Sequence, residues 1–310
     1  MQNDIKHITL PNGMILPRIG FGPGGCGYTP HYRRPHKGLW SIPGRAYNKL
    51  VRRPLQAKKY VAAVSSAIQN GFRLIDYSAA YGSGELVRAG IERSGVAREK
   101  LILTTRVSNQ AQFKGAEAVK QEFFAQLKGL GTDYVDILMF HWPVTGCYEQ
   151  TWQTMVELYH DGYVRTLGVA NCHAHHLERL ASLTEERPLI DQFEVHPLFT
   201  QKKLIAYCQE HGIQPEAYTP IARFDDRLVR LPLLHRIADK YHKSFLQIIL
   251  RWHIQNQLIP VVRTLNPNHQ KENLAIFDFQ LTDEEMHQID KININSRLRY
   301  DPDNCDFTIL

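Results

Sequence analysis

Short apolar runs alternate with amphipathic segments along most of the chain. The run FRLIDYS at 72–78 follows Gly71 and ends in small polar residues, which is typical of a buried strand that opens into a turn. The same pattern predicts further strands at 100–108, 133–143, 163–171, 188–196, 214–220 and 258–264. Helical spacing of apolar residues predicts helices at 60–71, 84–95, 116–131, 148–162, 174–183, 202–212, 233–255 and 268–277.

This alternation predicts the fold class. Counted from the glycine-rich bend FGPGGCG at 21–27, strand and helix alternate eight times, and the strands are apolar on both faces. Buried parallel strands that alternate with helices are typical of an α/β protein, here a (β/α)8 TIM barrel. We expect the whole chain, 1–310, to form this single domain, because barrels of that length are commonly one domain.

Two additions flank the predicted barrel. Residues 5–20 read as an N-terminal β-hairpin that turns at Asn12-Gly13, the strongest short turn signal, and that closes the bottom of the barrel. Residues 281–293 predict an extra C-terminal helix with Thr282 as its cap, and a tail follows it.

The net charge of +6 comes from one segment. Nine Lys and Arg and no acid lie between residues 29 and 60, and without them the chain has 28 basic against 31 acidic residues. The charge therefore does not indicate nucleic-acid binding by the whole protein. The basic segment 29–59 is predicted to be an insertion between strand one and helix one, on the catalytic face of the barrel. It would either recruit an anionic or sugar-like substrate, or form a solvated loop or a subunit contact.

The cysteine content indicates a reducing compartment. The five cysteines have no CxxC spacing, which favours reduced thiols and a cytoplasmic protein. No apolar run reaches the roughly 18 residues of a membrane span, and the first residues do not resemble a signal peptide. We therefore expect no membrane partner, while a monomer and a homodimer both remain possible.

Polar side chains stand where the predicted strands end, the position at which barrel enzymes carry their chemistry. Asp76 ends one strand and Tyr81 follows it past a turn. A tyrosine can donate a proton to a developing alkoxide when a nearby cation lowers its pKa from about 10. The other strands end in Arg106, His141, Ala170, Asn171, Gln192, Glu194, Tyr218, Arg263 and Thr264. Buried polar groups need partners, so we expect these side chains to converge on one another or on a ligand.

Seven segments, in this order, resemble the aldo-keto reductase family over nearly the whole chain. They are FRLIDYSAAYG, LILTTR, DILMFHWP, GVANC, DQFEVHP, EAYTP and KENLAIFDFQLTDEEM. The resemblance implies an enzyme that reduces a small-molecule carbonyl substrate with NADPH, on a barrel that needs no Rossmann domain.

The resemblance also implies individual roles. Tyr81 matches the proton donor, His141 the group that orients the carbonyl, and Asp76 the acid that pairs with the family's catalytic lysine. Asn171 and Gln192 would hold the nicotinamide carboxamide, Tyr218 would stack on the ring, and Glu272 and Asn273 would contact the adenine. The other nucleotide-binding residues would be Gly22, Pro23, Asp76 and Ala170. Trp142 and Trp40 would wall the substrate pocket, and the C-terminal tail would fold over its rim.

Two positions depart from the family pattern. Arg106 stands where the family has lysine; it keeps a cation beside Asp76, but a wide, planar guanidinium is not a conservative replacement. After strand eight, Arg263 and Thr264 are predicted to replace the lysine and serine that bind the 2′-phosphate, with His269 as a second basic contact. The alternative is that Arg263 only caps the following helix.

Two other functions compete with this interpretation. One is a metal-dependent barrel hydrolase with ligands from His141, Asp191, Glu194 and His196. It would leave Tyr81 and Gln192 without a role, so we expect no metal. The other is a nucleotide-binding subunit or sensor with little reductase activity, because Arg106 replaces the usual lysine.

Overall fold

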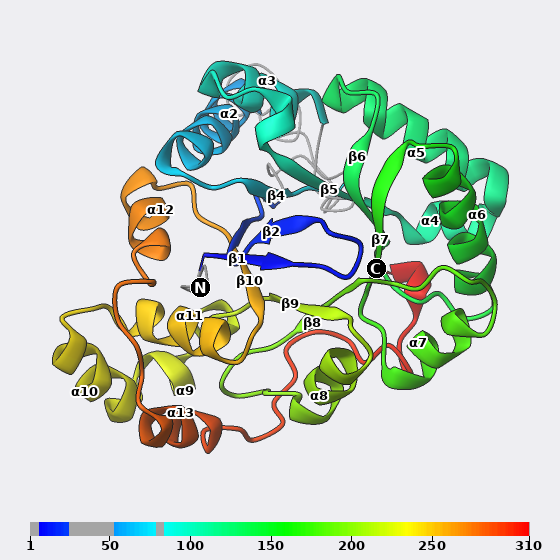
Figure 1. Ribbon diagram of the computed structural model, residues 1–310. Helices are drawn as coiled ribbons and strands as arrows, with labels where there is room; N and C mark the ends of the chain where they lie inside the picture. Colours follow the sequence, from blue (N-terminus) through cyan, green and yellow to red (C-terminus); the bar gives the residue numbers. More distant parts are fainter. Residues whose placement is uncertain (1–5, 25–52, 79–83, 310) are drawn as a thin grey trace, which may run out of the picture.

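Eight parallel strands form a closed barrel in the computed structural model, which describes residues 6–24, 53–78 and 84–309. In chain order the strands are β3 (Gly20–Phe21), β4 (Leu74–Asp76), β5 (Ile102–Val107), β6 (Val135–Phe140), β7 (Val164–Ala170), β8 (Ile190–Glu194), β9 (Gln214–Tyr218) and β10 (Ile259–Val262). β10 pairs with both β9 and β3, which closes the ring seen in Figure 1. The predicted (β/α)8 barrel is confirmed.

The helices surround the barrel (Figure 1). They are α2 (Arg53–Asn70), α3 (Gly84–Ser94), α4 (Asn109–Lys114), α5 (Ala116–Leu130), α6 (Tyr148–His160), α7 (Ala174–Ala181), α8 (Lys202–Glu210), α9 (Asp226–Val229), α10 (Pro232–Tyr241), α11 (Phe245–Gln255), α12 (Pro267–Leu274) and α13 (Asp283–Asp290). None of the helices in the described part of the chain is long and apolar enough to cross a membrane.

The structure corrects two predicted helix boundaries. The single helix expected over 233–255 is two helices, because His242 adopts a left-handed conformation (φ 53°) and Ser244 caps α11 with a capping box to Gln247. The expected insertion 29–59 is shorter than predicted, since α2 already begins at Arg53. Its remainder up to residue 52 lies outside the described residues.

The N-terminal hairpin closes one end of the barrel, as expected. β1 (His7–Thr9) and β2 (Ile15–Pro17) pair antiparallel, and Leu10 and Leu16 are buried. They pack in one cluster with side chains from the barrel strands, namely Leu74, Ile137, Met139, Ile190 and Ile259. Burying apolar surface at this end stabilises the barrel and leaves the opposite mouth for chemistry.

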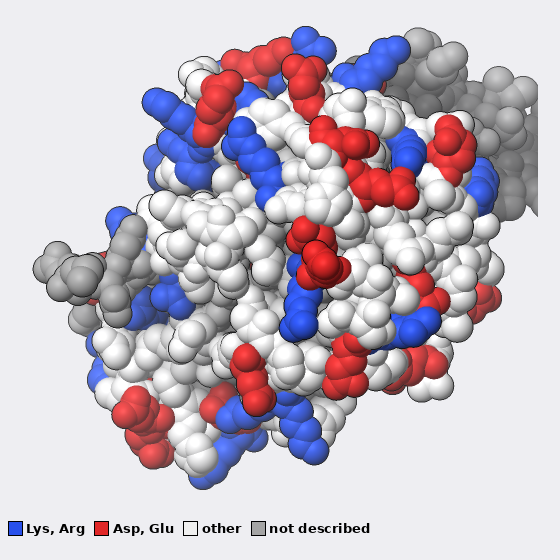
Figure 2. All heavy atoms as spheres, turned by 45° about the vertical axis from the view of Figure 1, so that its right-hand side comes forward, with Lys and Arg blue, Asp and Glu red and all other residues white. Residues whose placement is uncertain are grey.

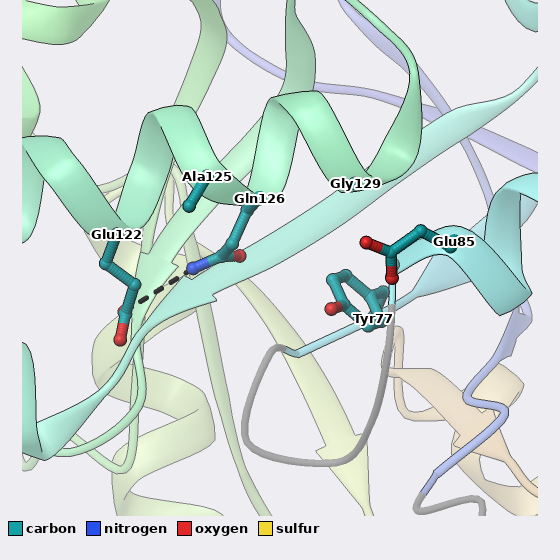
Figure 3. Close-up of a pocket in the computed structure, with 7 residues that line it drawn as sticks. Tyr77, Glu85, Glu122, Ala125, Gln126 and Gly129 are labelled. Atoms are coloured by element: carbon teal, nitrogen blue, oxygen red, sulfur yellow. Dashed lines mark hydrogen bonds between the residues drawn. The ribbon is translucent and has the colours of Figure 1, made fainter.

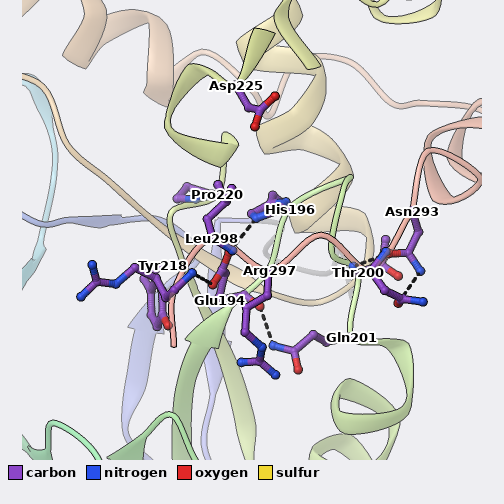
Figure 4. A network of polar contacts seen from close by, with 12 residues as sticks. Glu194, His196, Thr200, Gln201, Tyr218, Pro220, Asp225, Asn293, Arg297 and Leu298 are labelled. Carbon is purple, nitrogen blue, oxygen red and sulfur yellow. Dashed lines mark hydrogen bonds and ion pairs between the residues drawn. The ribbon is translucent and has the colours of Figure 1, made fainter. Parts of the chain in front are cut away.

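The C-terminal helix α13 has the predicted cap. The Thr282 hydroxyl accepts a hydrogen bond from the Glu285 N–H, and the Glu285 carboxylate accepts one from the Thr282 N–H. The tail beyond α13 returns to the barrel mouth, where the Glu194 carboxylate accepts hydrogen bonds from the N–H groups of Leu298 (2.7 Å) and Arg299 (2.8 Å), as Figure 4 shows for Leu298. A strand-end acid therefore anchors the tail.

Candidate active site

A buried hydrogen-bond network joins side chains of four barrel strands. The Arg106 guanidinium on β5 donates through Nη1 to Asp76 Oδ1 on β4 and through Nη2 to Gln192 Oε1 on β8 (2.8 Å). The Gln192 amide nitrogen donates to Asp76 Oδ2 (3.2 Å) and to Glu216 Oε2 on β9 (2.8 Å). All four side chains are buried, with Arg106 only 2% exposed. The expected convergence of Asp76, Arg106 and Gln192 is therefore found.

Glu216 also belongs to this network, although the strand-end pattern does not predict it. An acid in the middle of a buried strand, in the segment EAYTP, was the available signal. Burial, followed by the negative charge of Asp76, raises the pKa of Glu216 from 4.5 to about 7. The Arg106 guanidinium bonds Asp76 directly and reaches Glu216 only through Gln192, and Glu216 keeps its proton up to about neutral pH.

A Glu216→Gln variant is expected to gain stability over the wild type as the pH rises. The folded protein keeps a proton on Glu216 between pH 4.5 and about 7, where the unfolded chain has released it, so wild-type stability falls over this window. The glutamine cannot ionise, and its stability relative to wild type should rise by about 3 kcal/mol from pH 5 to pH 8. Urea unfolding at both pH values measures this.

The exposed Glu185 provides the control for that experiment. A Glu185→Gln variant should follow the wild type at both pH values, because its carboxyl is in water in both states. A constant difference between Glu216→Gln and wild type across the pH range would show that Glu216 ionises normally in the folded protein.

A second group of strand-end residues lies beside the network. The Tyr218 hydroxyl donates to Asn171 Oδ1 (2.7 Å), and the Asn171 amide donates to the backbone carbonyl of His141 (2.9 Å). Asn171 has a left-handed backbone (φ 61°), which asparagine tolerates better than most residues, and its N–H donates to the Gln192 carbonyl (2.9 Å). Ala170, buried at the end of β7, precedes it.

The His141 imidazole is neutral at physiological pH. Burial, together with the positive charges of Arg106 and Arg299, lowers the pKa of His141 from 6.5 to about 3. A neutral ring next to a fixed cation can orient a polar group by hydrogen bonding, but it is not a proton source at pH 7.

The predicted phosphate and adenine residues lie together on one segment. Arg263 follows β10, and its side chain lies against the backbone of Gly24, where an added Cβ would come within 2.6 Å of Nε. Thr264 accepts from the Asn266 N–H (3.1 Å), and Asn266 caps α12. Asn266, rather than Arg263, is therefore the N-cap of this helix. On α12, His269 and Glu272 are exposed and Asn273 is half-buried.

Gly22 and Pro23 lie at the end of β3 beside the network. The Gly22 N–H donates to the Val262 carbonyl (2.9 Å), and a Cβ added at Gly22 would come within 3.8 Å of the Asp76 carbonyl. Because Gly22 has no side chain, its backbone lies close to Asp76. Pro23, the next residue, is buried.

The tail covers Trp142. This residue is 2% exposed and packs against Phe307 of the tail, with ring centroids 6.4 Å apart, in a cluster with Val144. The Gln112 amide donates to its carbonyl (3.0 Å). The tail folds over the rim as expected, so Trp142 lies beneath it rather than on an open wall. Tyr81 and Trp40 lie outside the described residues.

The residues of the competing metal interpretation have other partners. Figure 4 shows His196 turned toward Glu194, at 2.9 Å between Nε2 and Oε1, and both side chains are fully buried. Glu194 also binds the tail, whereas Asp191 lies beside the backbone N–H of Cys172 (3.5 Å). Burial raises the pKa of Asp191 well above its usual value, which disfavours the ionised form that a metal ligand needs.

A further pocket lies among the helices that surround the barrel. Figure 3 shows it between α3 and α5, lined by Tyr77, Gly84, Glu85, Glu122, Ala125, Gln126 and Gly129. None of the predicted site residues lines it, and the Tyr77 carbonyl instead accepts from Arg106 (3.1 Å). We therefore assign the chemistry to the strand ends rather than to this pocket. On the face shown in Figure 2, acidic and basic side chains are interspersed, so this face does not carry an electrostatic potential of a single sign.

Comparisons with known proteins agree on one family. The model described as "Aldo/keto reductase family" matches residues 37–294. The chain is 40% identical to the glyoxal reductase of Bacillus subtilis (strain 168), over 79% of this chain and 87% of that protein. It is 36% identical to the methylglyoxal reductase DkgA of Salmonella typhimurium, over 96% of each. The crystal structure of a Bombyx mori aldo-keto reductase in complex with NADP has a TM-score of 0.79 and 31% identity, covering 96% of this chain and 95% of that one.

Proposed function

Because the chain belongs to the aldo/keto reductase family of oxidoreductases, we propose that it reduces an aldehyde or ketone to an alcohol with NADPH. The observation that carries the proposal is the buried pair of Asp76 and Arg106 at the barrel mouth, with the neutral His141 beside it. This supplies a fixed cation and a hydrogen-bonding ring at the strand ends. The names of the relatives make a small dicarbonyl such as methylglyoxal the substrate class that we favour.

The residues of the second group fit a nicotinamide nucleotide. The half-buried Tyr218 ring is held by its hydroxyl, and the Asn171 amide keeps one N–H and one lone pair beyond its two hydrogen bonds. The Gln192 amide is used almost completely by Arg106, Asp76 and Glu216, so we assign most of the carboxamide contact to Asn171. When bound, NADPH supplies a hydride to the carbonyl carbon.

The remaining nucleotide contacts are assigned along the barrel rim. The exposed Arg263, with Thr264 and His269, would hold the 2′-phosphate, because a guanidinium binds phosphate through charge-assisted hydrogen bonds. Glu272 and Asn273 would contact the adenine. Backbone at Gly22, Pro23 and Ala170 would lie beside the nicotinamide end.

The chain's own residues would handle the proton and the orientation of the substrate. Tyr81 would give its phenolic proton to the carbonyl oxygen, and Arg106 would favour the phenolate that remains. Asp76 fixes Arg106 by a buried ion pair, and the neutral His141 would donate a hydrogen bond that holds the carbonyl in place. The role of the basic segment 29–59 and of Trp40 in binding the substrate stays a prediction.

The proposal is tested by nucleotide titration followed by a turnover assay. Intrinsic fluorescence should show NADPH binding about tenfold to a hundredfold more tightly than NADH, the amount expected of charge-assisted bonds to one phosphate. The loss of NADPH absorbance with methylglyoxal or glyoxal as substrate should then show turnover.

An Arg263→Leu variant is the control for the nucleotide preference, because it should weaken NADPH binding and leave NADH binding unchanged. Tight NADPH binding without turnover on any carbonyl would contradict the reductase and favour a nucleotide-binding sensor or subunit. Binding of neither nucleotide would contradict both functions.

A further inference from the structure

Three histidines at the start of α7 meet one aspartate of the C-terminal tail. Asp303 Oδ2 lies 2.7 Å from His173 Nδ1, and Asp303 Oδ1 lies 3.3 Å from His175 Nε2 and 3.7 Å from His176 Nε2. One ligand atom from each of the four residues falls within 4.8 Å of every other. Figure 1 shows the C-terminal segment in red passing beside α7.

We propose that His173, His175, His176 and Asp303 bind one divalent transition-metal ion of the zinc type, and that the ion fastens the tail to α7. Three imidazoles and a carboxylate are a donor set that suits Zn²⁺, Ni²⁺ and Co²⁺. Tetrahedral bonds of about 2.0–2.2 Å would place the ligand atoms about 3.4 Å apart. The widest separation in the cluster therefore needs to shorten by at most about 1.4 Å, and the exposed His175 and Asp303 side chains are able to move that far.

The charges of the cluster suit a cation. Burial, with the neighbouring His175, lowers the pKa of His176 from 6.5 to about 4, so this ring is neutral at pH 7. Although burial alone would raise the pKa of Asp303, the hydrogen bond from His173 and the other two imidazoles lower it. An ionised carboxylate and a neutral imidazole are the forms that bind metal.

The affinity for the metal depends on the ring nitrogens of His173 and His176 that face away from Asp303. His176 Nδ1 accepts from the His173 N–H (3.1 Å), and His173 Nε2 lies 3.4 Å from Arg297 Nη2. The nitrogens that face Asp303 therefore carry the protons that a metal would displace. When the metal binds, each of these protons moves to the other nitrogen of its ring, and the hydrogen bond accepted there is lost. The loss of each hydrogen bond lowers the affinity for the metal roughly fivefold. We expect a dissociation constant in the micromolar range.

The position of the cluster gives the ion a structural consequence. Asp303 lies four residues before Phe307, which covers Trp142, the neighbour of His141. A bound ion would hold this part of the tail against the barrel mouth. The site is independent of the proposed reductase activity, since none of its four residues belongs to the strand-end network.

The test is a Zn²⁺ titration of the metal-stripped, full-length protein by isothermal calorimetry. We expect one ion per chain, and at least about tenfold weaker binding in His175→Ala and in Asp303→Asn. His160→Ala is the matched control, because His160 is also 60% exposed and lies 3.6 Å from a single carboxylate, Glu186. It should bind Zn²⁺ like the wild type. A Co²⁺ absorption spectrum without a thiolate charge-transfer band should confirm that no cysteine is a ligand.

Trypsin cleavage after Arg299 measures the attachment of the tail. Zn²⁺ should slow this cleavage in the wild type and in His160→Ala, but not in His175→Ala. The proposal is overturned by a stoichiometry well below one, by equal loss of binding in His160→Ala, or by a thiolate band with Co²⁺. Wild-type binding in Asp303→Asn would equally overturn it, because the ion would then not hold the tail.

Discussion

Arg106→Met is expected to destabilise the fold by about 3–5 kcal/mol, the cost of removing one partner from a buried ion pair. Asp76 and Glu216 would be left in one buried network with Gln192 and no cation. Turnover should fall at least about a hundredfold, because nothing would then favour a developing phenolate. Urea unfolding and a turnover assay measure the two effects.

The pH dependence of this variant checks the cause. Glu216, whose pKa is raised to about 7, is protonated at pH 5, where the network then holds one negative charge rather than two. The stability lost in Arg106→Met should therefore be smaller at pH 5 than at pH 8. An equal loss at both values would mean that packing of the long side chain, rather than its charge, accounts for the effect.

Arg106→Lys is the matched variant, because it keeps the charge and removes the planar fork. A single ammonium is not expected to serve both Asp76 and Gln192 in the same way, so stability should fall by about 1 kcal/mol and the Gln192 amide should become available to the nucleotide. Turnover and its pH profile should both change. If both stay the same, the arginine at this position has no special role.

The barrel was predictable because its pattern repeats. The run at 133–143 contains β6, whose residues Val135–Phe140 are all buried, and its apolar period and short length separate such a strand from the helices beside it. The break at His242 was not predictable from period, because apolar spacing continues through it and a single left-handed residue ends the helix.

The site was predictable where a side chain ends a strand, and not where a partner comes from elsewhere. Asp76 ends β4 and meets Gln192, which lies two residues before the end of β8. Glu216 is the register partner of Gln192 on the neighbouring strand, a pairing that only the assembled barrel shows, and Asp303 is far along the chain from the histidines of α7. The sequence alone does not indicate that such residues are close in space, because the course of the C-terminal tail depends on how it packs against the barrel.

Tyr81→Phe is expected to lower turnover about a hundredfold to ten-thousandfold, the usual contribution of a positioned general acid. The ring stays and only the hydroxyl is lost, so NADPH binding and the urea midpoint should both remain close to the wild type. Stopped-flow or steady-state loss of NADPH absorbance gives the rate, and the fluorescence titration gives the affinity. A loss confined to kcat would indicate an interaction that is made only in the transition state.

Tyr77→Phe is the control, because the same stretch of sequence offers two phenols. Tyr77 lines the pocket between α3 and α5 with Glu85 and Glu122 (Figure 3), and its backbone carbonyl accepts a hydrogen bond from Arg106. Its substitution should change turnover by no more than a few fold. The opposite pattern, with Tyr77→Phe inactive and Tyr81→Phe active, would reassign the proton donor and move the reaction from the strand ends toward that pocket.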